Sequence, residues 1–159
     1  MAKATVDNLR AEGWRKDQFG GDFALTSAFD DYLTSLLAEA GNWAAYRIGQ
    51  PVYAALVIDY LIDCVRRAEL AYCAYRLWTR RASYSDSQAV GAFQDGQYLE
   101  RREYLAHSTA AMAVAEAALA EVMRALGIDP AEQLGVPAFA IGHIETGPFT
   151  LHSETSISV

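Results

Sequence analysis

Apolar residues recur along most of the chain at the three- and four-residue spacing that is typical of α-helices. Two long windows also lack the residues that interrupt helices. Residues 97–126 contain no glycine or proline, and Pro51 is the only one of either type in residues 50–90. These windows predict the helices that make up most of the fold. We therefore predict a mainly α protein, an antiparallel helical bundle with an extended C-terminal arm that forms a strand or a hairpin.

Changes in composition divide this predicted fold into three parts. Glycines and mixed charges dominate an N-terminal extension, helical patterning marks the body, and the arm lacks lysine and arginine. We place these parts at residues 1–25, 26–127 and 128–159. With 159 residues, of which 52% are hydrophobic, the chain fits one domain with a sizeable core.

Two helices are predicted in the N-terminal third of the chain. A short helix covers about Thr5–Glu12. The next begins near Ser27, because Ser27 and Asp30 resemble a capping pair whose side-chain oxygens accept hydrogen bonds from free backbone N–H groups. Gly41 is predicted to end this helix, since glycine readily adopts the left-handed conformation that follows a helix.

Gln50 and Pro51 open the next predicted helix, with proline in the first turn, where its missing N–H costs nothing. This helix extends through residues 52–82, either continuously or with a kink near Cys64–Arg67. Its first half is apolar on nearly every side, which predicts burial between several elements. Its second half is amphipathic, with one apolar stripe that consists of Val65, Ala68, Tyr72, Tyr75 and Trp78.

A polar break at Ser83–Ser87 and a loop bracketed by Gly91 and Gly96 precede the last predicted helix, at about residues 97–126. Gly127 is predicted to end that helix. The residues that suggest its core-facing stripe are Leu105, Met112, Ala115, Leu119, Val122 and Leu126.

The arm has a different pattern. From residue 149 onward every even position is polar, and the odd positions include four large apolar residues, which is the period of a β-strand. A second extended candidate at Phe139–Glu145 precedes a turn at Thr146–Pro148, so a hairpin is one possible form of the arm.

A lone strand or hairpin is only marginally stable in water, so we expect a neighbouring subunit or another partner to complete the arm. A disordered or back-packed tail is the alternative. The residues predicted to dock the arm on a neighbour or partner are Phe139, Ile141, Ile144, Phe149, Leu151, Ile157 and Val159.

Net charge narrows the class of partners. The chain carries a formal charge of −7, whereas a protein that binds nucleic acid tightly neutralises phosphates with lysine and arginine. This argues against tight binding of DNA or RNA by the isolated subunit, although nucleic acid can pass near it. The most apolar stretch, Val52–Val65, is interrupted by Asp59 and Asp63, so no membrane span is expected.

Catalytic residues are not evident in the sequence. On one helix Cys64 and Cys73 would lie roughly 13 Å apart at about 1.5 Å rise per residue, too far for a disulfide, and we expect two buried thiols in a reducing compartment. Glu100, Glu103 and His107 share a helix face, but di-iron bundles need Glu-x-x-His on two helices. We predict no enzyme activity, no metal site and no cofactor, and keep a metal carrier as a minor hypothesis.

Three pairs of arginines stand on the predicted helices. Asp63 lies four residues before Arg67, a spacing that favours an ion pair. A solvated or inter-subunit salt-bridging role is the main interpretation of the pairs, and contact with the phosphates of a confined DNA is the alternative. The residues are Arg66, Arg67, Arg80, Arg81, Arg101 and Arg102.

The segment Val65–Ala82, VRRAELAYCAYRLWTRRA, is followed by a polar break, an alanine-rich helix and the closing element Gly142–Phe149, GHIETGPF. From about Pro51 onward this order of elements resembles the head–tail connector (adaptor, or head-completion) proteins of long-tailed bacteriophages and prophages. The resemblance leaves residues 1–50 uncovered.

The resemblance implies a structural protein of the virion neck that assembles in the host cytoplasm. Such proteins form a ring, typically of twelve copies, between the portal protein and a tail or tail-terminator protein. DNA passes through the ring during packaging and ejection, and the ring provides a surface for tail attachment. The alternative function is a small helical binding or regulatory module of bacterial origin that dimerises through its alanine-rich helix.

Overall fold

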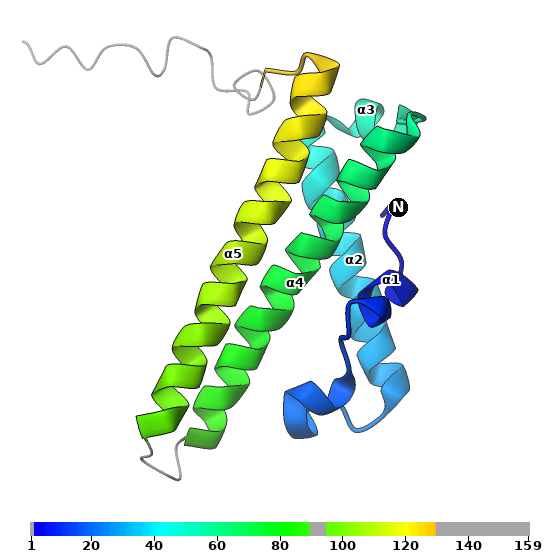
Figure 1. Ribbon diagram of the computed structural model, residues 1–159. Helices are drawn as coiled ribbons and strands as arrows, with labels where there is room; N and C mark the ends of the chain where they lie inside the picture. The colour runs from blue at the N-terminus through cyan, green and yellow to red at the C-terminus, as the bar shows by residue number, and fades with distance from the viewer. Residues whose placement is uncertain (1, 90–94, 130–159) are drawn as a thin grey trace, which may run out of the picture.

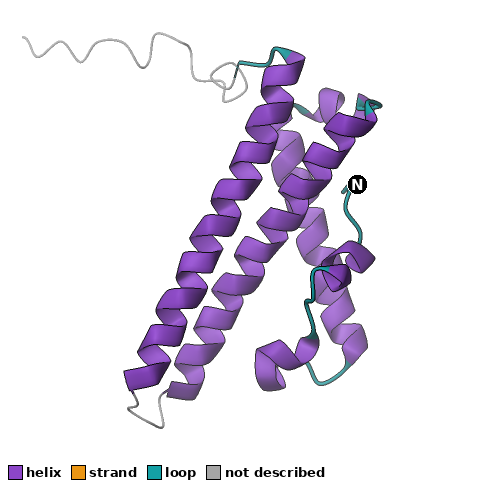
Figure 2. Ribbon diagram, in the orientation of Figure 1, coloured by secondary structure: helices purple, strands orange, loops and turns teal. Residues whose placement is uncertain are grey.

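A computed structural model describes residues 2–89 and 95–129, and this part of the chain is mainly helical with no strand (Figures 1 and 2). The mainly α prediction is therefore confirmed. Residues 130–159, where the strand or hairpin was predicted, lie outside the described residues. In order, the elements are α1 (Val6–Ala11), the 3-10 helix η1 (Lys16–Asp22), α2 (Thr26–Ile48), α3 (Gln50–Ala55), α4 (Asp59–Ala89) and α5 (Asp95–Leu126).

The two longest helices, α4 and α5, lie side by side and run in opposite directions (Figure 1). Helix α2 packs against α4, and α1 and η1 lie beside α2 and α4. None of the helices in the described residues is long and apolar enough to cross a membrane.

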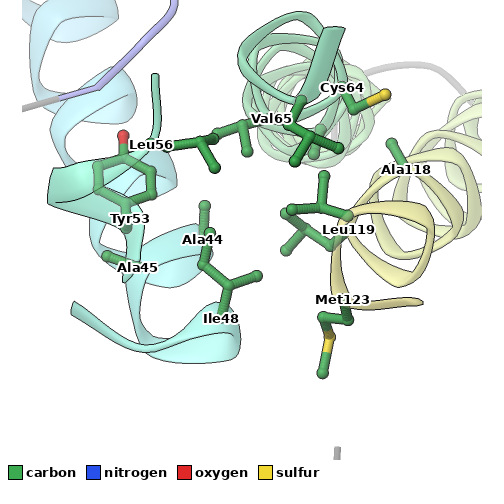
Figure 3. Close-up of a cluster of buried hydrophobic side chains, with 13 residues drawn as sticks. Ala44, Ala45, Ile48, Tyr53, Leu56, Cys64, Val65, Ala118, Leu119 and Met123 are labelled. Carbon is green, nitrogen blue, oxygen red and sulfur yellow. The ribbon is translucent and has the colours of Figure 1, made fainter. Parts of the chain in front are cut away.

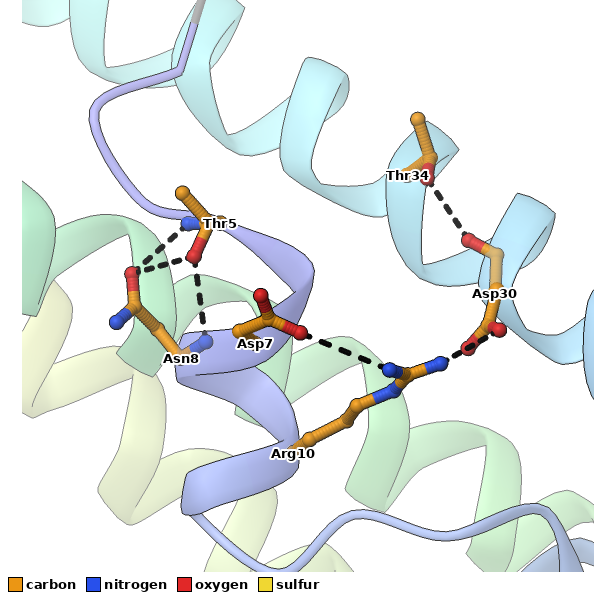
Figure 4. A network of polar contacts seen from close by, with 6 residues as sticks. All are labelled: Thr5, Asp7, Asn8, Arg10, Asp30 and Thr34. Carbon is orange, nitrogen blue, oxygen red and sulfur yellow. Dashed lines mark hydrogen bonds and ion pairs between the residues drawn. The ribbon is translucent and has the colours of Figure 1, made fainter.

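Helix α1 forms where the sequence predicted it, because Thr5 and Asn8 cap it reciprocally. The Thr5 hydroxyl accepts a hydrogen bond from the Asn8 N–H, and the Asn8 side chain accepts one from the Thr5 N–H (Figure 4). One turn later Arg10 contacts Asp7 at 3.6 Å and Asp30 of α2 at 2.6 Å. These contacts join α1 to α2.

Helix α2 begins at Thr26, next to the predicted start at Ser27, but the predicted capping pair and the predicted end at Gly41 are wrong. Leu25 is its N-cap residue and makes no side-chain capping hydrogen bond. The carboxylate of Asp30 accepts a hydrogen bond from Arg10 and not from the free backbone N–H groups of the helix. Gly41 lies inside α2 and is buried. A Cβ at Gly41 would lie 3.0 Å from the backbone of Ala2, so this glycine allows the N-terminal segment to pack closely on the helix. The helix ends at Gly49, whose φ is +91°.

Helix α3 begins at Gln50 with Pro51 in its first turn, as predicted. The break that follows lies at residues 56–58 and not near Cys64–Arg67. Leu56 is extended and buries its side chain, whereas Cys64 and Val65 stay helical inside the core. The predicted burial of this region is wrong at Val57, Ile58 and Tyr60, which are all exposed.

Helix α4 continues through the polar residues at 83–87, so the break predicted there is wrong. Gly96 lies within α5, and residues 90–94 lie outside the described part of the chain. At the other end of α5, Gly127 ends the helix with a φ of +66°, as predicted. Of the predicted core stripe, Ala115, Leu119 and Val122 are buried, but Leu105 is 41% exposed.

The described residues bury two apolar clusters. The first joins α2, α3, α4 and α5 at the end of the molecule where α5 terminates (Figure 3). It consists of Ala44, Ala45, Ile48, Tyr53, Leu56, Leu61, Cys64, Val65, Ala68, Ala118, Leu119, Val122 and Met123.

The second cluster joins the N-terminal segment, residues 2–25, to α2 and α4. It consists of Ala4, Leu9, Trp14, Phe19, Phe23, Phe29, Leu33, Leu36, Leu37, Ala40, Cys73 and Leu77. Phe19 is fully buried and packs on three aromatic rings, with ring centroids 5.6 to 6.3 Å apart. The N-terminal extension of residues 1–25, for which the sequence suggested no role, thus supplies five of the twelve residues of this cluster.

Candidate interaction surface

The arginines singled out in the sequence lie on the two long helices. Arg66, Arg67, Arg80 and Arg81 belong to α4, and Arg101 and Arg102 belong to α5. The seven predicted docking residues of the arm, from Phe139 to Val159, lie outside the described residues.

Asp63 pairs with Arg66 and not, as predicted, with Arg67. One guanidinium nitrogen of Arg66 lies 2.5 Å from the Asp63 carboxylate, and its Nε contacts the Lys3 carbonyl oxygen at 3.5 Å. Arg66 is thereby engaged in holding the N-terminal segment on α4. Arg67 is exposed and makes no ion pair with any residue that the structure describes.

Arg80 and Arg81 lie over aromatic rings. The guanidinium of Arg80 is 4.8 Å from the ring centroid of Phe23 and 4.5 Å from that of Tyr32. That of Arg81 is 4.7 Å from the ring of Tyr104 on α5. Cation–π contacts of this kind hold the charge against the body of the protein. These two arginines are therefore part of the packing, which favours a structural role over contact with phosphates.

The aromatic residues of α4 join neighbouring elements, as their amphipathic character predicts. Trp78 packs edge-on against Trp14 at 4.9 Å and stacks on His107 of α5 at 5.0 Å. Tyr72 stacks on Trp43 of α2 at 4.8 Å, and its hydroxyl donates to Glu39 at 2.8 Å. Burial, together with Glu39, raises the pKa of Tyr72 to about 12, so the hydroxyl remains a donor at neutral pH.

Of the residues considered for metal binding, Glu103 and His107 have side chains that the structure describes, and that of Glu100 lies outside this part. Glu103 and His107 are both exposed, and the imidazole of His107 stacks on Trp78. Within residues 2–89 and 95–129 no three His, Cys, Asp or Glu side chains are grouped so that they could hold an ion.

Both cysteines are free and buried, as predicted. Burial raises the pKa of the Cys73 thiol to about 12, so it stays protonated at neutral pH. A protonated thiol is a poor nucleophile, and Cys73 packs instead as a small apolar residue.

Glu69 is the polar residue that the sequence reading missed. Its side chain is fully buried on α4 between the two core clusters. One carboxylate oxygen accepts hydrogen bonds from the backbone N–H groups of Lys3 and Ala4, each at 2.7 Å, and the other accepts a short one from the Tyr53 hydroxyl. The sequence did contain a sign of this buried charge, because Glu69 stands among the residues of the apolar stripe, between Ala68 and Tyr72.

The environment of Glu69 acts on its pKa in two directions. Burial raises the pKa, and the hydrogen bonds from Tyr53, Ala4 and Lys3 oppose it, with a net increase. Burial, together with the Glu69 carboxylate, also raises the pKa of Tyr53, so that its hydroxyl stays a donor. The site is therefore a structural anchor for the N-terminal segment.

The raised pKa of Glu69 gives a pH-dependence that can be tested against Glu69→Gln. Since the folded-state pKa lies above the ordinary value of 4.5, the folded protein binds this proton more tightly than the unfolded chain does. The proton-linked part of the stability is therefore complete below about pH 4.5 and is lost as the pH rises through the folded-state pKa, in addition to what the hydrogen bonds of Glu69 contribute. We expect native protein to gain stability relative to Glu69→Gln when the pH falls from about 7 to about 5. Urea unfolding of both proteins at each pH measures this, and a constant difference would contradict it.

The first half of α5 is covered on one side only. Of residues 101–114, Ser108 alone is buried, and its hydroxyl lies 2.8 Å from that of Thr79 on α4. Leu105 and Val114 are 41% and 50% exposed, but they stand nine residues apart and therefore on opposite sides of α5. The outer face between them consists of the exposed alanines Ala106, Ala110, Ala113 and Ala117. By contrast, the second half of α5 packs into the first core cluster, and Glu116 contacts Arg47 of α2 at 3.8 Å. Among the described residues α5 thus leaves an outer face of small apolar side chains uncovered.

Comparison with known proteins gives no assignment: no family model, no curated protein and no solved structure matches this chain.

Proposed function

We propose that this chain is a structural protein of the virion neck of a long-tailed bacteriophage, which forms a ring between the portal and the tail. The observation that carries the proposal is the outer face of α5, a long helix on which the alanines at 106, 110, 113 and 117 are all exposed in the part of the chain that the structure describes. A neighbouring copy that packs against this helix would cover these side chains. Side-to-side packing of helices repeated around an axis produces a ring.

In this proposal the described helices belong to an antiparallel bundle, and residues 128–159 form the arm that docks on a neighbour or on the portal. Alternation of apolar residues from position 149 supports the arm, because a single strand needs a partner for its backbone groups. The ring would provide the tail-attachment surface.

Passage of DNA through such a ring is consistent with the electrostatics. The chain carries a net charge of −7, and Arg80 and Arg81 are held over aromatic rings. A wall with few free cations binds few phosphates, so DNA would slide through it without sticking.

Mass measurement tests the proposal. By light scattering we expect a large homo-oligomer, either alone or on a portal ring, and Ala110→Glu should reduce the assembled fraction because it places a charge in the helix interface. Ala38→Glu, which adds the same charge on the exposed side of α2, is the matched control. A strict monomer that also fails to bind a portal ring would refute the proposal.

Truncation tests the arm. Removing residues 130–159 should leave the helical circular dichroism of the body nearly unchanged and abolish assembly. The cut follows Asp129 because Ile128 packs on the first core cluster and its N–H donates to the Met123 carbonyl at 2.9 Å. Loss of helical structure in the truncated chain would instead place the arm in the monomer's own core.

The alternative is a small helical binding or regulatory module. The same uncovered face of α5 would support a dimer, since its alanines let two helices approach closely. A defined dimer that neither grows nor binds a portal ring would favour this alternative.

A further inference from the structure

An open groove lies on the outer side of α4 and α5, where the end of α1 forms one wall. Its volume is about 420 Å³. Apolar side chains of the two long helices and charged side chains surround it: Glu12, Asp63, Arg66, Arg67, Leu70, Ala71, Ala74, Ala111 and Val114.

The groove combines an apolar floor with a charged rim. Leu70, Ala71 and Ala74 of α4 face it together with Ala111 and Val114 of α5, and the small alanines leave room for a foreign side chain. Val114 is half-exposed, which costs free energy as long as the groove holds only water. Such a surface suits an apolar segment.

One cation on the rim is free to pair. Within the described residues Asp63 is bound to Arg66, whereas Arg67 on α4 and Glu12 at the end of α1 are exposed and have no ion pair, so the rim favours a carboxylate only beside Arg67. A segment with carboxylates beside its apolar residues would therefore find both an apolar floor and a partner for its charge.

The chain itself contains a segment of this chemistry. Residues 130–159 include no lysine or arginine, and their only charged side chains are Glu132, Glu145 and Glu154. Glu154 stands between two apolar pairs, Phe149 with Leu151 and Ile157 with Val159. The charge of this segment is thus complementary to Arg67.

The length of the segment allows it to reach another copy. Val114 and Gly127 are separated on α5 by about 20 Å, at about 1.5 Å per residue. The roughly 20 residues between the end of α5 and position 149 span up to roughly 65 Å when extended. Residues 149–159 can therefore reach a groove on an adjacent subunit.

We propose that the groove beside Arg67 receives residues 149–159 of a neighbouring copy of this chain. The choice of a neighbour rests on the ring proposed above, and it makes the contact heterologous, with arm and groove on different subunits. Contacts of this type close into a ring when the rotation between copies is a fraction of a full turn.

Charge reversal at the rim is the first test. Arg67→Glu in the full chain should weaken assembly about tenfold, seen as a shift of the assembly midpoint to higher protein concentration, because it brings like charges together. Arg15→Glu makes the same change at an exposed position that does not line the groove. Both residues are exposed, so both variants should fold. Equal assembly of the Arg67→Glu and Arg15→Glu variants would contradict the proposal.

Cross-linking locates the occupant. We would mix two full-length variants, Val114→Cys and Leu151→Cys, with a short bismaleimide, and expect a covalent dimer. The native Cys64 and Cys73 are buried and should not react. Ala38→Cys in place of Val114→Cys is the control and should give no product with Leu151→Cys.

The outcomes separate this inference from the proposed function. A large assembly without the cross-link overturns the groove as docking site and leaves the ring intact. A link that forms only when both cysteines are in one chain overturns the inference, because the arm then occupies its own groove. A cross-linked pair that grows no further supports the docking site and contradicts the ring, whereas a monomer without any link contradicts both.

Discussion

Replacing Glu69 with alanine should lower the free energy of unfolding by about 3–5 kcal/mol. The change removes the acceptor for two backbone N–H groups and for the Tyr53 hydroxyl, and an unsatisfied buried donor costs about 1–3 kcal/mol. Urea denaturation at neutral pH measures the loss. We also expect the N-terminal segment to become accessible to proteases, since Lys3 and Ala4 lose their partner.

Glu69→Gln is the matched control for this result. Its amide oxygen can still accept from the N–H groups of Lys3 and Ala4, so most of the anchor is retained and the expected loss is about 1 kcal/mol. If Glu69→Ala and Glu69→Gln unfold at the same urea concentration, the carboxylate does not anchor the N-terminal segment.

Replacing Phe19 with alanine should cost about 3–5 kcal/mol, the usual range for deleting a fully buried aromatic side chain. Phe19 contacts Trp14, Phe23 and Phe29, so its removal leaves a cavity in the second core cluster. Leu25→Ala, at a position that is 65% exposed, should change stability by less than about 0.5 kcal/mol. Thermal and urea unfolding measure both, and a neutral Phe19→Ala would mean that residues 2–25 do not belong to the core.

Much of the helical architecture could be predicted because it depends on local rules. Windows without glycine or proline became α4 and α5, Pro51 opened α3, and Gly127 closed α5. Gly41 misled the prediction because a glycine can serve two purposes. It can end a helix, or it can let another segment approach, and only the position of Ala2 in space distinguishes the two.

The candidate surface was less predictable, since its contacts join residues far apart in the sequence. That Arg80 lies over Phe23 and Tyr32 depends on the path of the N-terminal segment, which has no simple periodicity. The charged residue Glu69 within an apolar stripe indicates a buried carboxylate that needs hydrogen-bond donors. The sequence could not identify these donors, because Lys3 and Ala4 are more than 60 residues away.

Helix α4 carries residues of both core clusters, Leu61 to Ala68 for the first and Cys73 and Leu77 for the second. Adding or deleting one residue between these groups, near Leu70, would turn one set of side chains by about 100° relative to the other. One cluster would then face water whichever way the helix was placed. Changes of chain length during evolution are therefore expected at the linker of residues 56–58, where Val57 is exposed, and not in the middle of α4.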